Sequence, residues 1–184
     1  MKRLIIPALA LAACSQQTQQ SNVANEPASN LPDINTSAPE APLNPPAPGE
    51  PGGLPDDRTP ISEGPIEANS AQGAGQVLQR YFALLESGKA DEADGLWSGS
   101  GTPQDFAAKL ARYREVHGNI GAPGALEGAA GSIYVDIPVQ LYGRLTNGKE
   151  FNSRGTMTLR RVNDVPGSTD EERRWHIYKA DFPA

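Results

Sequence analysis

The chain has a single cysteine, Cys14, among its 184 residues, so no disulfide can form within one molecule. It also has no surplus of positive charge, because 16 lysines and arginines stand against 22 aspartates and glutamates. Nucleic-acid-binding proteins carry basic patches, often interleaved with aromatic residues, so this composition predicts no nucleic-acid partner. The sequence shows neither a cluster at metal-ligand spacing nor a glycine-rich phosphate loop before a helix. It therefore predicts no metal and no cofactor.

Long hydrophobic runs are also missing. A membrane-spanning helix needs about 20 apolar residues, whereas the N-terminal apolar run extends only from Leu4 to Ala13. The run follows the basic pair Lys2-Arg3. A basic start followed by a short apolar run is typical of a secretory signal.

The segment Leu11-Ala12-Ala13-Cys14 resembles a bacterial lipobox. The resemblance implies cleavage of a signal peptide, residues 1–13, and acylation of Cys14 with chains such as palmitate. Each buried methylene of an acyl chain contributes about 0.8 kcal/mol to membrane binding, so several chains hold a protein on the bilayer. Ser15 resembles the pattern of lipoproteins that are moved to the outer membrane and face the periplasm. The alternative is an ordinary signal peptide with a chance cysteine.

Residues 14–70 form the lipidated cysteine and a segment rich in proline, alanine, glycine and glutamate. Eleven of the 17 prolines lie between Pro27 and Pro65, and apolar residues are sparse there. Such a composition cannot bury enough surface to offset the entropy of ordering, which predicts a disordered tether. A docking motif at Asn44–Pro48 is the alternative hypothesis.

From residue 71 the pattern becomes that of a folded domain, which we expect to span residues 71–184. Apolar residues at helical spacing predict a helix over Gln76–Leu85, ended by Gly88, and a short helix over Ala90–Leu96. Thr102 is a good N-cap for a third helix. The apolar stripe expected for that helix consists of Phe106, Leu110, Tyr113 and His117.

Alternation of apolar and polar residues over Ser132–Leu145 predicts a strand whose odd-numbered side chains enter the core. Asn147-Gly148 predicts a type I′ hairpin turn into a return strand over residues 151–162. We also expect a weak edge strand at Ala125–Ala129 and a last strand at Arg173–Phe182.

Helices followed by antiparallel strands predict an α+β domain with the helices on one sheet face. This order, Thr-Pro-x-Asp-Phe at residues 102–106 and Arg-Trp-x-Ile-x-x-x-x-Phe at residues 174–182 together resemble the NTF2-like, or cystatin-like, roll. The resemblance covers residues 71–184 and implies three N-terminal helices packed on a curved antiparallel sheet. The family contains isomerases, cyclases, dehydratases and non-catalytic binding domains, so the fold leaves the function open.

Enzymes of the resembled family need an Asp, or an Asp–His pair, in a cavity between helices and sheet. Strand parity instead turns Asp136 to the opposite face. His117 and His176 are more simply explained as structural, and Asp105 as an acid at a helix start. We therefore predict no catalytic residue.

Two groups of residues are candidates for binding. An apolar pocket, or simply a core, is expected from Tyr81, Trp97, Phe106, Tyr113 and Met157. An association face, for a homodimer or an envelope protein, is expected from Tyr134, Asp136, Tyr142 and Arg144.

The hypothesis that follows is a periplasmic lipoprotein, held on the bilayer through Cys14. Its domain would be a non-catalytic accessory that binds an envelope protein or a small apolar ligand. The alternative is an NTF2-like isomerase, cyclase or dehydratase that uses general acid–base catalysis.

Overall fold

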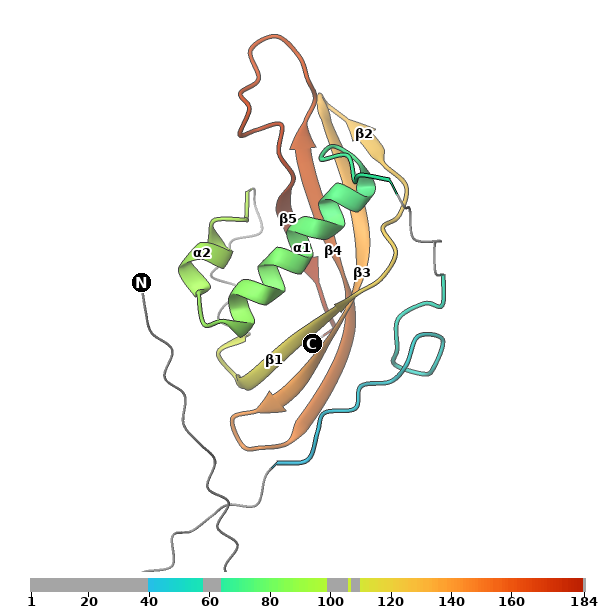
Figure 1. The fold of residues 1–184 in the computed structure, drawn as a ribbon, viewed down its shortest axis with the longest axis vertical. Helices are drawn as coiled ribbons and strands as arrows, with labels where there is room; N and C mark the ends of the chain where they lie inside the picture. Colours follow the sequence, from blue (N-terminus) through green and yellow to red (C-terminus); the bar gives the residue numbers. More distant parts are fainter. Residues whose placement is uncertain (1–39, 58–63, 99–105, 107–109, 184) are drawn as a thin grey trace, which may run out of the picture. The chain divides into compact units, whose positions relative to one another are not determined.

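The computed structural model describes residues 40–57, 64–98, 106 and 110–183, and a compact unit extends over Ala41–Ala184. In this unit helix α1 covers one face of an antiparallel sheet (Figure 1). The elements are α1 (Ala71–Glu86), α2 (Ala90–Asp94), β1 (Tyr113–Ile120), β2 (Glu127–Ala129), β3 (Ser132–Leu145), β4 (Glu150–Val162) and β5 (His176–Asp181). The predicted α+β class, with helices on one face of a curved antiparallel sheet, is confirmed.

The sheet is built around the long hairpin of β3 and β4. Its order is β1-β3-β4-β5, and the short β2 pairs with the beginning of β3. The odd-numbered side chains of β3 form the buried row, with exposures of 1% for Val135 and 0% for Ile137 and Val139. Asp136 is exposed, as the alternation predicts. We call the face under α1 the inner face and the face with Asp136 the outer face.

The turn between β3 and β4 is not the predicted type I′ turn. Only Gly148 has a positive φ, and the Leu145 amide donates to the Lys149 carbonyl at 2.8 Å. These features belong to a three-residue loop with glycine in the left-handed region. The two-residue turn with both φ values positive lies instead at Ala130–Gly131, between β2 and β3.

Helix α1 begins earlier than the apolar stripe indicates, because Ser70 caps it. The Ser70 hydroxyl accepts a hydrogen bond from the Gly73 amide at 3.1 Å. The predicted stop at Gly88 is confirmed: its φ is +70°, and the Lys89 amide donates to the Leu84 carbonyl at 2.9 Å. This six-to-one bond is that of a Schellman motif.

The predicted third helix does not extend to His117. Phe106 and Leu110 are helical, and the expected start at Thr102 lies outside the described residues. Tyr113–Ile120 is strand β1, which pairs with β3 from Leu145 to Val139. The apolar residues of this stretch fit both helical spacing and strand alternation. The strand forms because its pairing with β3 satisfies the backbone hydrogen-bonding groups along one edge of β3.

Residues 41–57, which we call the strap, pack on the outer face of the sheet. Gln140 Nε2 donates to the Pro46 and Gly52 carbonyls, each at 3.2 Å. Arg154 donates to the Gly53 carbonyl at 2.9 Å, and Leu54 is 7% exposed. The prediction of a disordered tether up to residue 70 is therefore wrong for the strap. The compact unit begins about thirty residues before the predicted boundary, at Ala41.

Gly118 on β1 lets α1 approach the sheet closely. A Cβ at this position would lie 2.6 Å from the Phe82 ring. We expect Gly118→Ala to lower the free energy of unfolding by about 1–3 kcal/mol, through overpacking. Gly128→Ala in β2 is the matched control, because nothing lies within 4 Å of its added Cβ. Urea denaturation of both variants measures the difference, and equal midpoints would contradict this packing.

Candidate binding groove

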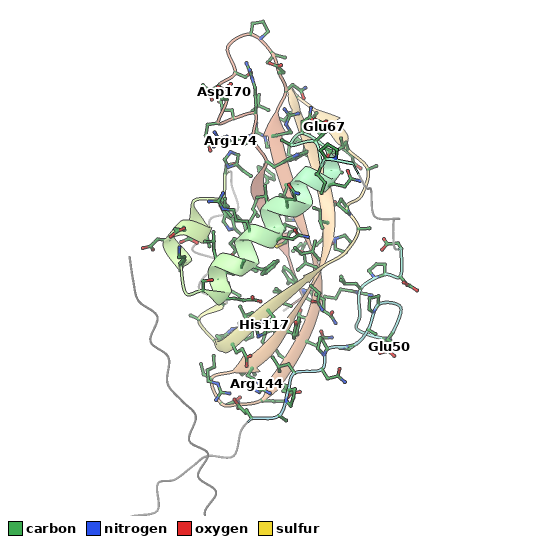
Figure 2. All side chains as sticks on the ribbon, in the orientation of Figure 1. Glu50, Glu67, His117, Arg144, Asp170 and Arg174 are labelled. Carbon is green, nitrogen blue, oxygen red and sulfur yellow. The ribbon has the colours of Figure 1, made fainter. Side chains whose placement is uncertain are left out.

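A groove separates the N-terminal half of α1 from the residues that lead into β5. Its volume is about 650 Å³. The α1 side contributes Gln76, Val77 and Arg80, and the opposite side contributes Trp175. Three more arginines and two glutamates complete the charged rim: Arg161, Arg173, Arg174, Glu67 and Glu171. Figure 2 shows Glu67 and Arg174 at this end of the domain.

The arginines of the groove are not equally neutralised. Arg173 lies 3.1 Å from Asp164, and Arg174 lies 3.1 Å from Glu171. Arg161 donates through Nε to the Arg173 carbonyl at 2.8 Å, and its guanidinium lies 5.9 Å from the centre of the Trp175 ring. Arg80 forms no ion pair with any residue that the structure describes. The groove therefore retains positive charge beside an apolar floor.

This arrangement suits a ligand with an anionic group on an apolar body. Guanidinium groups bind carboxylates and phosphates in a planar, two-point geometry. Trp175 is 4% exposed and lines the groove as its aromatic residue. This groove was not predicted from the sequence, because its residues come from segments about 80 to 100 positions apart. The available signal was Arg80, which lies off the apolar stripe of α1.

Four of the five residues predicted to line an apolar pocket lie together in the core. The Tyr81 ring centre is 6.0 Å from that of Trp97 and 6.4 Å from that of Phe106, and Met157 is fully buried. Tyr113 is separate and stacks on Phe151 at 4.2 Å. Burial raises the pKa of the Tyr81 hydroxyl, which stays protonated at neutral pH. The rings pack against one another between α1 and the sheet.

His117 lies on the outer face, in a hydrogen-bonded network with carboxylates. Its Nδ1 is 2.8 Å from Glu86 and its Nε2 is 2.9 Å from Glu115. Glu115 also accepts a hydrogen bond from Arg144 at 2.8 Å. Figure 2 shows His117 and Arg144 at the end of the domain that carries the β3–β4 turn. The network joins the end of α1 to β1 and β3, which is a structural role.

The residues of the predicted association face do not form one free surface. Arg144 is 6% exposed and donates to the Ala41 carbonyl of the strap as well as to Glu115. Tyr142 stacks on His117 with ring centres 5.3 Å apart. Tyr134 and Asp136 lie farther along β3, where Asp136 accepts a hydrogen bond from Thr158 at 2.6 Å. The strap thus occupies the half of the face that contains Arg144.

Cys14 and the lipobox lie outside the described residues. Among the residues that are described, no helix is long and apolar enough to cross a membrane. The same residues contain no group of three His, Cys, Asp or Glu side chains placed to hold a metal ion.

The network around His117 generates a testable titration. Partial burial acts to lower the pKa of His117, but the hydrogen bonds with Glu115 and Glu86 outweigh it and raise the pKa. The imidazolium therefore stabilises the fold at pH values below the ordinary histidine pKa. This contribution to stability is lost as the pH rises through the raised pKa of His117 in the folded protein. We expect Glu115→Gln to lower the pKa of His117 in an NMR titration, while the exposed Glu127→Gln leaves it unchanged. Equal pKa values in all three proteins would rule out the network.

Comparisons with known proteins concern the fold. No protein-family model and no curated protein matches this chain. A protein from Novosphingobium aromaticivorans, named as a candidate scytalone dehydratase, is 12% identical, with a TM-score of 0.45 over 60% of this chain and 80% of its own. An NTF2-like superfamily protein from Salmonella enterica serovar Typhimurium is 10% identical, with a TM-score of 0.44 over 61% and 89%. The Kfla4162 protein from Kribbella flavida is 10% identical, with a TM-score of 0.44 over 63% and 91%. At TM-scores below 0.5, these likenesses carry no argument about the family or the chemistry of this chain.

Proposed function

We propose that this chain is a lipid-anchored protein of the bacterial envelope whose domain binds a ligand without converting it. The observation that carries the proposal is the groove beside α1, where arginines surround the buried Trp175. An apolar floor with a few convergent charged groups is the usual form of a binding site. The rings of Tyr81, Trp97 and Phe106 support it, because they pack against one another in the hydrophobic core.

The ligand that fits this groove carries a carboxylate or phosphate on an apolar body. Arg80 and Arg161 offer guanidinium groups that no carboxylate among the described residues pairs. Two sources share this chemistry: a small amphiphile, or an acidic and apolar segment of an envelope protein. Crosslinking from the groove separates the two sources.

The proposed anchor is acylated Cys14 at the outer membrane, facing the periplasm. Since the strap begins at Ala41, the proposed tether is reduced to the 26 residues from 15 to 40.

The second candidate is an isomerase, cyclase or dehydratase that works by general acid–base catalysis. The observation in its favour is the buried hydroxyl of Tyr81, an ionisable group in the described interior. A protonated hydroxyl in an apolar site can donate a hydrogen bond to a developing oxyanion. Its ring contacts with Trp97 and Phe106 favour a packing role instead.

The groove is tested with the anionic, aromatic probe 8-anilinonaphthalene sulfonate. We expect Arg80→Gln to raise the dissociation constant of the probe about threefold or more, because the variant removes an unpaired cation. Lys179→Gln, which changes an exposed cation on β5 outside the groove, is the matched control. The proposal is wrong if both variants bind the probe as the wild type does.

Photocrosslinking in intact cells then identifies the source of the ligand. Gln76 and Gln79 are both exposed on α1, but only Gln76 lines the groove. A protein crosslinked at Gln76 and not at Gln79 indicates an envelope partner. An amphiphile that copurifies, without a protein crosslink, indicates a small ligand.

The anchor is tested by Cys14→Ser. We expect this variant to lose metabolic labelling with palmitate and to leave the membrane fraction, because the thiol is the proposed acylation site. Ser15→Ala is the control and keeps the label. Palmitate labelling that persists without Cys14 would exclude the lipobox interpretation.

A further inference from the structure

One edge of β4 is open over its first five residues, Glu150 to Arg154. Strand β5 pairs with β4 only between Thr156 and Arg160, whereas β3 pairs with the whole of β4. Residues 150–154 therefore have a neighbouring strand on one side only, among the residues that the structure describes, whereas Gly155 lies against Asp181 and Phe182. An open strand edge presents unpaired backbone groups that can pair with another chain.

The hairpin geometry shows which backbone groups face this edge. Leu145 and Lys149 form the hydrogen-bonded pair that closes the turn. Such pairs alternate with non-hydrogen-bonded pairs along an antiparallel ladder, so Glu150, Asn152 and Arg154 direct their N–H and C=O groups away from β3. No backbone hydrogen bond from another described segment reaches these groups, and all three side chains are exposed.

The open edge is complementary to itself. If a second copy pairs antiparallel with Asn152 on the two-fold axis, Glu150 of each copy lies opposite Arg154 of the other. Opposite charges facing each other across paired strands stabilise the pairing. The same register aligns all three outward-facing residues of each copy, whereas a shift by two residues in either direction aligns fewer.

An apolar surface lies beside the same edge on the inner face. The stacked rings of Tyr113 and Phe151 are only half-buried, and they line an open hollow of about 940 Å³. In the symmetric register Phe151 lies opposite Ser153 of the second copy. The added strand would therefore cover the exposed side of this aromatic stack and bury apolar area that one copy leaves in water.

We propose that two copies of this chain associate edge to edge through residues 150–154 of β4, with Asn152 on the two-fold axis. The contact continues the sheet from one molecule into the next. It leaves the strap in place, since Asn152 and Arg154 donate to the strap carbonyls through their side chains and use their backbone for pairing. It is also independent of the groove beside α1.

Sedimentation of the detergent-solubilised full chain tests the pairing. We expect a monomer–dimer equilibrium in the wild type. Glu150→Arg and Arg154→Glu each place like charges opposite one another twice per dimer, and each should raise the dissociation constant about tenfold. The double variant Glu150→Arg/Arg154→Glu restores opposite charges and should return the constant to that of the wild type. Glu127→Arg, on the exposed β2, controls for charge reversal elsewhere.

Asn152→Pro is a second, independent test of pairing through the β4 edge. It removes an N–H that points away from β3, so the hairpin is expected to fold while the edge loses its central donor. Far-UV circular dichroism checks that each variant folds. If a charge variant does not fold, the sedimentation result for Asn152→Pro decides the test. A wild type that stays monomeric at all concentrations overturns the proposal. The proposal is also overturned if Asn152→Pro and both single charge reversals leave the dissociation constant of the dimer unchanged. It is overturned as well if the double variant does not return this constant to the wild-type value.

Discussion

The domain depends on the alternation of side chains along β3. Val135, Ile137 and Val139 are almost completely buried beneath α1, and their burial determines which face of the hairpin lies inside. A shift of the strand by one residue would expose the whole row, so the register is strongly specified. The even-numbered residues of β3 must then lie on the outer face, and that face becomes the binding surface of the strap.

The outer face explains why a proline-rich segment becomes part of the fold. Gln140 is 1% exposed, and a buried amide needs hydrogen-bond partners. The strap supplies backbone carbonyls from Pro46 and Gly52. Composition correctly indicates that residues 41–57 cannot form a core of their own. Composition does not predict that this segment binds the sheet, because the contacts are made by its backbone carbonyl groups, which every sequence has.

The elements that were predicted well are those with local signals: the hairpin of β3 and β4 and the end of α1 at Gly88. Strand β1 was not predicted, because its identity depends on the edge of β3 that it pairs with. Asp136 was placed correctly from parity alone. The groove could not be predicted in the same way, since Arg80 and Trp175 meet only through the packing of α1 on the sheet.

The strap also determines how mechanical load enters the domain. Arg144 holds the Ala41 carbonyl, and the side chains of Asn152 and Arg154 hold the strap farther along. A pull on the chain before Ala41 is therefore resisted by the long hairpin before it can reach α1. If the N-terminus is fixed to a membrane, shear at the cell surface would strain the most extensively paired strands and leave the helix unstressed.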